Sequence, residues 1–180
     1  MNVTPSFKKT TEKKASFDAL ALRKVYGIIY SAPEQELALA DFFQRNQLTL
    51  TRLSSNETFL PYLPLEENLF ITSTIKERDR KAVLAEAFQV FQLEPALLGR
   101  SFTSFTTFEK IKMRIIQLLF SKTSTLVIDD IFSSLTIGQR QEILPQLKIA
   151  VQKRNKRLLF LTTDCDQTFS LVFSDFNIRK

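Results

Sequence analysis

The chain has 180 residues, 44% of them hydrophobic and 24% charged, and its formal net charge is +6. This length and composition fit one globular domain with a sizeable core. Histidine is absent and cysteine occurs once, at Cys165, so a Ser-His-Asp triad, the usual zinc sites and an internal disulfide are all excluded.

The charge and the apolar pattern also bear on location and partners. No apolar run approaches the roughly 18 residues needed to cross a bilayer, and the N-terminus lacks the apolar stretch of a secretory signal. We therefore expect a cytoplasmic protein with no transmembrane segment of its own. Basic residues gather in KKTTEKK (8–14) and KIAVQKRNKR (148–157), but no aromatic residues alternate with them, so we do not expect a nucleic-acid partner.

The first half of the chain alternates strand and helix signals. VYGIIY (25–30) is β-branched and aromatic and predicts a buried strand. Residues 31–46 predict a helix with proline in its first turn, and LTLTRL (48–53) predicts a second strand. The two prolines of FLPYLPLEENL (59–69) mark a turn, and a helix is expected to start at Leu65.

The second half continues the alternation. Residues 75–93 and 105–122 predict amphipathic helices, the second capped by Thr106 or Thr107 with Glu109 in its first turn. TLVIDD (125–130) and RLLFLTTD (157–164) predict fully buried strands. The helix between them is expected to be interrupted by Pro145, and a short helix and an edge strand are expected after residue 165. Such an order predicts a single α/β domain, 1–180, with a mostly parallel sheet flanked by helices.

At this point the chain resembles an ATP-binding-cassette (ABC) ATPase domain, which has a P-loop NTPase fold. Residues 105–130 have the length of the family's stretch from the LSGGQ signature to the Walker B acids. On that register the magnesium-associated aspartate falls on Asp129 and the catalytic glutamate on Asp130. The Ser-Gly-Gly-Gln positions of the signature fall on Thr106, Thr107, Phe108 and Glu109.

The upstream half of the resemblance concerns the phosphate-binding loop. Residues 25–43 resemble a Walker A strand, loop and helix, with the family's lysine at Glu36 and its Ser or Thr at Leu37. Phe7 lies where an aromatic residue commonly stacks on adenine. The loop YSAPEQE has no glycine, its proline lacks an N–H, and its glutamates would face the phosphates of ATP.

Further motifs are matched in spacing but not in identity. FLPYLPLEENL is close to the family's pattern after the Q-loop and puts Ser55 at the glutamine position. FLTTD (160–164) resembles the H-loop strand, with Thr163 in place of the switch histidine. We therefore expect no catalytic residue, with Asp129 and Asp130 vestigial. We also expect no bound cofactor and no metal, although Asp129 is a weak metal candidate; bound ATP with magnesium is the alternative.

The resemblance also implies a layout and a docking region. It implies a helical insert at about 68–112 and a reduced antiparallel β-subdomain. The basic residues near the N-terminus indicate a basic, flexible segment at 1–16. In the family, the region after the Q-loop and the insert form the cleft that receives a permease's coupling helix. The residues expected to contact a partner there are Phe59, Leu60, Pro61, Tyr62, Leu63, Glu66 and Glu67.

Three hypotheses follow. The first is a catalytically inactive ABC-ATPase-like subunit, a structural or regulatory partner of a membrane permease, a competent ABC ATPase, or both. Such a subunit would be cytoplasmic or peripheral at the inner face of the cell membrane. The second is a weak ATP-binding half-site subunit of a heteromeric ABC transporter. The third is a soluble protein- or nucleic-acid-binding module unrelated to transport.

Overall fold

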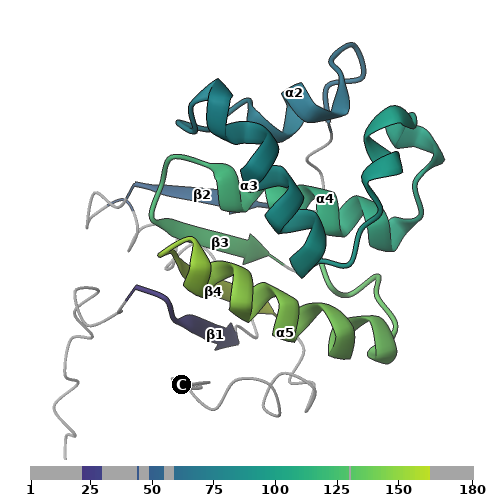
Figure 1. The fold of residues 1–180 in the computed structure, drawn as a ribbon. Coiled ribbons are helices and arrows are strands. Elements are labelled where there is room, and N and C mark those ends of the chain that lie inside the picture. The colour runs from purple at the N-terminus through teal and green to yellow at the C-terminus, as the bar shows by residue number, and fades with distance from the viewer. Residues whose placement is uncertain (1–21, 30–43, 45–48, 55–58, 130, 163–180) are drawn as a thin grey trace, which may run out of the picture.

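The computed structural model describes residues 22–29, 44, 49–54, 59–129 and 131–162 (Figure 1). Within these residues four strands form one sheet, in the order β1-β4-β3-β2, and every neighbouring pair is parallel. The strands are β1 (Val25–Ile29), β2 (Leu50–Leu53), β3 (Thr125–Asp129) and β4 (Arg157–Thr162). The predicted parallel α/β architecture and these four predicted strands are confirmed.

Strand β2 joins the main sheet. It pairs with β3 alone among the described strands, in a register that sets Leu50 opposite Thr125 and Leu53 opposite Ile128. The strand Leu50–Leu53 therefore belongs to the parallel sheet and not to the reduced antiparallel subdomain that the resemblance implied. Within the described residues, one isolated antiparallel bridge lies outside the strands, between Ser73 and Ser121.

Four α-helices surround the described sheet: α2 (Leu65–Phe70), α3 (Glu77–Val90), α4 (Thr107–Phe120) and α5 (Ile137–Lys153). Two short 3-10 helices, η2 (Pro95–Gly99) and η3 (Phe102–Ser104), connect α3 to α4. In Figure 1, α2 and α3 lie on the β2 side of the sheet, and α5 lies over β4. Helix α4 packs against α2, β2 and α5, so it joins the helical region to the sheet. None of the helices in this part of the chain is both long and apolar enough to cross a membrane.

The expected interruption at Pro145 is wrong, because α5 runs continuously from Ile137 to Lys153 with the proline inside it. Proline cannot donate the hydrogen bond that the carbonyl of Gln141 would accept in a regular helix. Pro145 is exposed, whereas Leu144 and Leu147 are fully buried. Burial of this apolar face offsets the missing hydrogen bond and keeps the helix intact.

The core lies between the sheet and α4 and α5. Leu126 and Ile128 on one face of β3 are completely buried, and Val127 on the other face is 1% exposed, as the apolar pattern predicts for a strand covered on both faces. The ring of Phe132, just after β3, packs 4.9 Å from that of Phe160 in β4. This packing fixes the end of β3, where the candidate site begins.

Candidate functional site

Some of the predicted site residues lie outside the described residues, so their positions stay predictions. These are Phe7, Glu36, Leu37, Ser55, Asp130 and Thr163. The Walker-A-like loop and the switch position are therefore inferred from the sequence alone. The remaining site residues lie at three places: the end of β3, the start of α4, and the segment 59–67 that leads into α2.

Asp129 is the last residue of β3, and its carboxylate forms an ion pair with the guanidinium of Arg52 on β2. Arg52 lies opposite Val127 in the strand register, so its side chain extends along β3 to reach Asp129, two residues further on. The Asp129 side chain is only 14% exposed, while that of Arg52 is 40% exposed. The negative charge of this acid is therefore balanced by a cation from the same chain.

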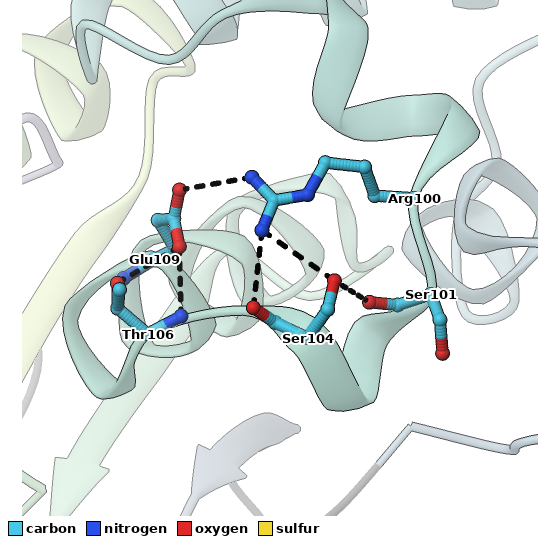
Figure 2. A network of polar contacts seen from close by, with 5 residues as sticks. All are labelled: Arg100, Ser101, Ser104, Thr106 and Glu109. Carbon is cyan, nitrogen blue, oxygen red and sulfur yellow. Dashed lines mark hydrogen bonds and ion pairs between the residues drawn. The ribbon is translucent and has the colours of Figure 1, made fainter.

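The start of α4 is closed by a reciprocal capping box, shown in Figure 2. The Thr106 hydroxyl accepts a hydrogen bond from the backbone N–H of Glu109 at 3.2 Å. In return, the Glu109 carboxylate accepts from the Thr106 backbone N–H at 2.7 Å and from its hydroxyl at 2.9 Å. Thr106, one of the two predicted caps, is thus the N-cap, and Thr107 is the first helical residue.

Arg100 extends this network toward the preceding 3-10 turn (Figure 2). One guanidinium nitrogen lies 3.8 Å from the Glu109 carboxylate, and another donates to the carbonyl of Ser104 at 3.0 Å. The guanidinium also lies 5.4 Å from the centre of the Phe105 ring. The backbone N–H of Thr106 is the main cause that lowers the pKa of Glu109, and Arg100 acts in the same direction. Glu109 is therefore a stable carboxylate at neutral pH.

Phe108 is at the second glycine position of the signature in the resemblance. Its side chain is half-buried, and the ammonium of Lys112 lies 4.3 Å from its ring centre. That ammonium is buried and donates to the carbonyl of Phe91 at 2.9 Å and to Glu142 at 2.7 Å. The signature-like segment is therefore tied to both α3 and α5.

The loop of residues 60–64 is shaped by one buried side chain, that of Asn68 in α2. Its amide nitrogen donates to the carbonyls of Leu60 and Leu63, each at 3.0 Å, and of Pro64 at 3.2 Å. Its amide oxygen accepts from the Leu60 N–H at 2.8 Å. Asn68 lies inside the predicted docking segment, but the sequence reasoning did not single it out.

The predicted docking residues divide by burial. Phe59 is only 6% exposed and packs edge-on against Phe102 at 4.4 Å, so its side chain belongs to the core and cannot contact a partner directly. Leu60 and Leu63 are half-buried, whereas Pro61, Tyr62, Glu66 and Glu67 are exposed. Tyr62 is 75% exposed, and Glu67 lies 3.8 Å from Arg80.

A cleft of about 390 Å3 opens between β2, α2 and α4, and we call it the β2–α2–α4 cleft. Gln117 of α4 donates to the carbonyl of Asn68 at 2.7 Å, and Arg114 donates to the carbonyl of Ser54, so α4 is tied to both of the other walls. The residues that line the cleft include Thr51, Arg52, Leu60, Ile71, Thr72 and Arg114. Sequence reasoning missed both arginines, because single basic residues on a strand or a helix look like ordinary solvated positions.

Among the described residues, no group of three or more acidic, cysteine or histidine side chains is placed to hold a metal ion. Asp129 therefore belongs to no such group within this part of the chain. Its positively charged partner is Arg52.

Comparison with known proteins shows the fold. The sequence matches no protein-family model and no curated protein. Among solved structures, it is similar to an inward-facing ABC transporter described as metal-chelate type, with a TM-score of 0.58 and 16% identity over 79% of this chain. It is also similar to a bacterial ABC transporter cassette solved as a dimer, with a TM-score of 0.57 and 12% identity over 78% of this chain.

These likenesses define the class of fold as that of the ABC transporter ATPase cassettes. The chain spans 64% of the first of these proteins and 75% of the second. The predicted fold family is therefore confirmed at the level of architecture.

Proposed function

We propose that this chain is an ABC-ATPase-like subunit that does not hydrolyse ATP and instead serves as a structural or regulatory partner. Its partner is a membrane permease, a competent ABC ATPase, or both, and it acts at the cytoplasmic face of the membrane. The observation that carries the proposal is the capping box at the start of α4. In it, the side chains of Thr106 and Glu109 each accept a hydrogen bond from the other residue's backbone N–H.

The closed helix start argues against a phosphate at this position. A helix N-terminus binds phosphate through free backbone N–H groups and its positive dipole end. Here the Thr106 and Glu109 N–H groups have intramolecular acceptors, and a carboxylate of lowered pKa already occupies the positive end. The described residues of this segment therefore do not fit a nucleotide phosphate, which Glu109 would repel.

The ion pair between Arg52 and Asp129, on two strands of the sheet, also supports a subunit that does not hydrolyse ATP. In the family, the aspartate at this position is associated with magnesium. A magnesium ion bound here would have to compete with a guanidinium that is already paired with the carboxylate. The described residues of the site thus hold no arrangement suited to magnesium-assisted phosphoryl transfer, which depends on positioned donors and cations.

The β2–α2–α4 cleft supports the docking part of the proposal. It lies beside the 60–64 loop, in the region that the resemblance assigns to the coupling helix of a permease. The loop is rigidly bonded through Asn68, so the cleft wall is organised before any partner arrives. Ile71 is 51% exposed at this wall and offers an apolar contact to an incoming helix.

The inactive state is tested by titrating the purified full-length protein with ATP and Mg²⁺ in a calorimeter and by thermal shift. We expect no heat of binding, no rise in Tm and no phosphate release at about 1 mM nucleotide, at which a sub-millimolar site would give measurable stabilisation. Stabilisation by Mg-ATP would overturn the proposal and favour the alternative of a weak ATP-binding half-site.

Docking is tested separately by site-specific photo-crosslinking in the native host. A crosslinking residue replaces Ile71 in the cleft in one variant and Ile137 at the start of α5 in the control; these isoleucines are 51% and 63% exposed. We expect the Ile71 variant alone to form a product that mass spectrometry identifies as an ABC permease subunit. Equal products from both positions, or none containing a transporter component, would contradict docking at this cleft.

A further inference from the structure

Basic side chains gather where the strands of the sheet begin. Figure 1 shows the starts of β1 and β3 and the end of α5 on the same side of the molecule. Backbone hydrogen bonds hold these segments together, from Arg157 N–H to the Ser124 carbonyl at 2.9 Å and from Leu158 N–H to the Lys24 carbonyl at 3.0 Å. We call this surface the basic end; its cations are Arg23, Lys24, Lys122, Lys153, Arg154, Lys156 and Arg157.

The backbone of the basic end is fixed by a clasp between Arg23 and Asn155. Both residues adopt left-handed backbone conformations, with φ of 64° and 52°. The Arg23 side chain donates to the Asn155 side-chain oxygen at 2.9 Å, and its backbone N–H donates to the Lys156 carbonyl. The entry to β1 and the turn between α5 and β4 are thereby locked together, which keeps the cations close.

Among the described residues, Glu86 pairs with two of these cations. Glu86 of α3 lies 3.1 Å from the Lys153 ammonium and 3.0 Å from the Arg154 guanidinium. The Lys156 ammonium donates to the carbonyls of Ser121, at 2.8 Å, and Thr123. The pKa of Lys156 is lowered, first by burial and then by the positive charge of Arg154. Arg23, Lys24 and Lys122 are exposed at this end.

The basic end borders the β2–α2–α4 cleft. The backbone N–H of Lys122 donates to the carbonyl of Thr72 at 3.1 Å, and Thr72 lines the cleft. The hydroxyl of Thr51, another lining residue, lies 2.7 Å from that of Thr123. A surface that meets the basic end would therefore also meet the mouth of the cleft.

The exposed apolar side chains beside these cations are aliphatic. Leu22, next to Arg23, is 37% exposed, and Ile149 is 46% exposed one helical turn before Lys153, on the same face of α5. Aliphatic and basic side chains together suit the boundary between headgroups and acyl chains. Sequence-tolerant binding of single-stranded nucleic acid needs aromatic stacking platforms. Tyr62, the exposed large aromatic residue of the described part, lies in the 60–64 loop instead.

We propose that the basic end binds the anionic headgroups of a lipid bilayer through Arg23, Lys24 and Lys122 and thereby turns the β2–α2–α4 cleft toward the membrane. This binding goes beyond the docking role proposed above, because it requires no protein partner. Each lysine held near an anionic surface strengthens attachment by an amount equivalent to roughly a fivefold change in partitioning.

The proposal is tested by co-sedimentation of the purified full-length protein with vesicles. One set is pure phosphatidylcholine, and the other carries about 30% phosphatidylserine. We expect binding to the anionic vesicles only, weakening as salt rises. The variant Lys122→Gln should partition about fivefold more weakly, and adding Lys24→Gln should weaken it further. The matched control is Lys110→Gln. Lys110 lies in the first turn of α4, whereas Lys122 follows the last turn of the same helix, so this variant should bind like the parent.

A second control addresses the basic residues near the N-terminus. Lys8, Lys9, Lys13 and Lys14 are replaced by glutamine in the full-length chain. Loss of binding in this variant, with no effect of Lys122→Gln, would overturn the proposal. So would equal binding to neutral vesicles, or a Lys122-dependent affinity for an oligonucleotide without any preference for anionic lipid. Because vesicles contain no permease, the outcome is independent of the docking experiment.

Discussion

Arg52 on β2 and Asp129 on β3 form an ion pair that joins two neighbouring parallel strands at the mouth of the candidate site. The pair is diagonal, because Arg52 lies opposite Val127 and reaches forward to the strand end. It does two things at once. It neutralises the carboxylate of Asp129, and it ties β2 to β3.

We predict energetic coupling between these two residues. Arg52→Met should lower the free energy of unfolding by about 1 kcal/mol, a modest value because the arginine is partly exposed and screened. Asp129→Asn should cost a similar amount. In a double-mutant cycle read by urea denaturation, the coupling energy should be about 0.5 to 1 kcal/mol. Strictly additive effects would show that the pair contributes nothing to stability.

The two capping boxes predict a difference in acid sensitivity. Thr106 pairs with Glu109 at α4, and Thr136 pairs with Gln139 at α5. Of these two capping boxes, only the one at α4 contains a carboxylate that can be protonated. Because the pKa of Glu109 is lowered in the folded protein, its contribution is full above its unfolded pKa and is lost as pH falls through the folded pKa.

The variant Glu109→Gln should therefore lose less stability than the parent when urea denaturation at about pH 7 is compared with about pH 3. Thr106→Ala and Thr136→Ala should each cost about 1 kcal/mol at neutral pH. Only the Thr106 variant should also change the acid sensitivity. The same pH response in Glu109→Gln and the parent would argue against a charged cap.

We expect substitutions of Asn68 to destabilise the 60–64 loop. Asn68→Ala would remove four hydrogen bonds and leave the Leu63 carbonyl and the Leu60 N–H without the side-chain partner, at a cost of about 2 to 3 kcal/mol, whereas the carbonyls of Leu60 and Pro64 keep backbone donors. Asn68→Asp keeps the bond from the Leu60 N–H but sets a carboxylate against the carbonyls, so it should not rescue stability. Urea denaturation and limited proteolysis at Tyr62 report the two effects, and a stable aspartate variant would refute this account of the loop.

Pro145 offers a stabilising substitution. Pro145→Ala restores a backbone donor inside α5 and should raise the free energy of unfolding by about 1 to 3 kcal/mol. Pro145→Gly restores the same donor but should gain about 1 kcal/mol less, because glycine loses more backbone entropy in a helix. Thermal unfolding of the two variants separates these contributions, and a destabilised alanine variant would mean that the ring packs favourably where it is.

Local patterns in the chain were enough to place most of the described elements. The apolar patterns at 25–30, 125–130 and 157–164 predicted strands, and the structure has strands at Val25–Ile29, Thr125–Asp129 and Arg157–Thr162. In the last two, side chains on both faces are buried, which favours apolar and branched residues. Thr106 and Glu109 marked a helix start because a capping box operates within four residues. The spacing of these elements was also sufficient to indicate an ABC cassette architecture, which the similar solved structures share.

Long-range contacts decided the rest. No local signal says that β2 pairs in parallel with β3, that Arg52 meets Asp129, or that Phe59 lies in the core. Each depends on segments dozens of residues apart, whose contacts form only when the whole core packs. The continuity of α5 through Pro145 has the same origin, since burial of its apolar face outweighs a local penalty. The helices and strands thus followed from the sequence alone, through short-range propensity and burial pattern. Which strands pair, which charges meet and where the cleft lies were settled only by the packing of the tertiary structure.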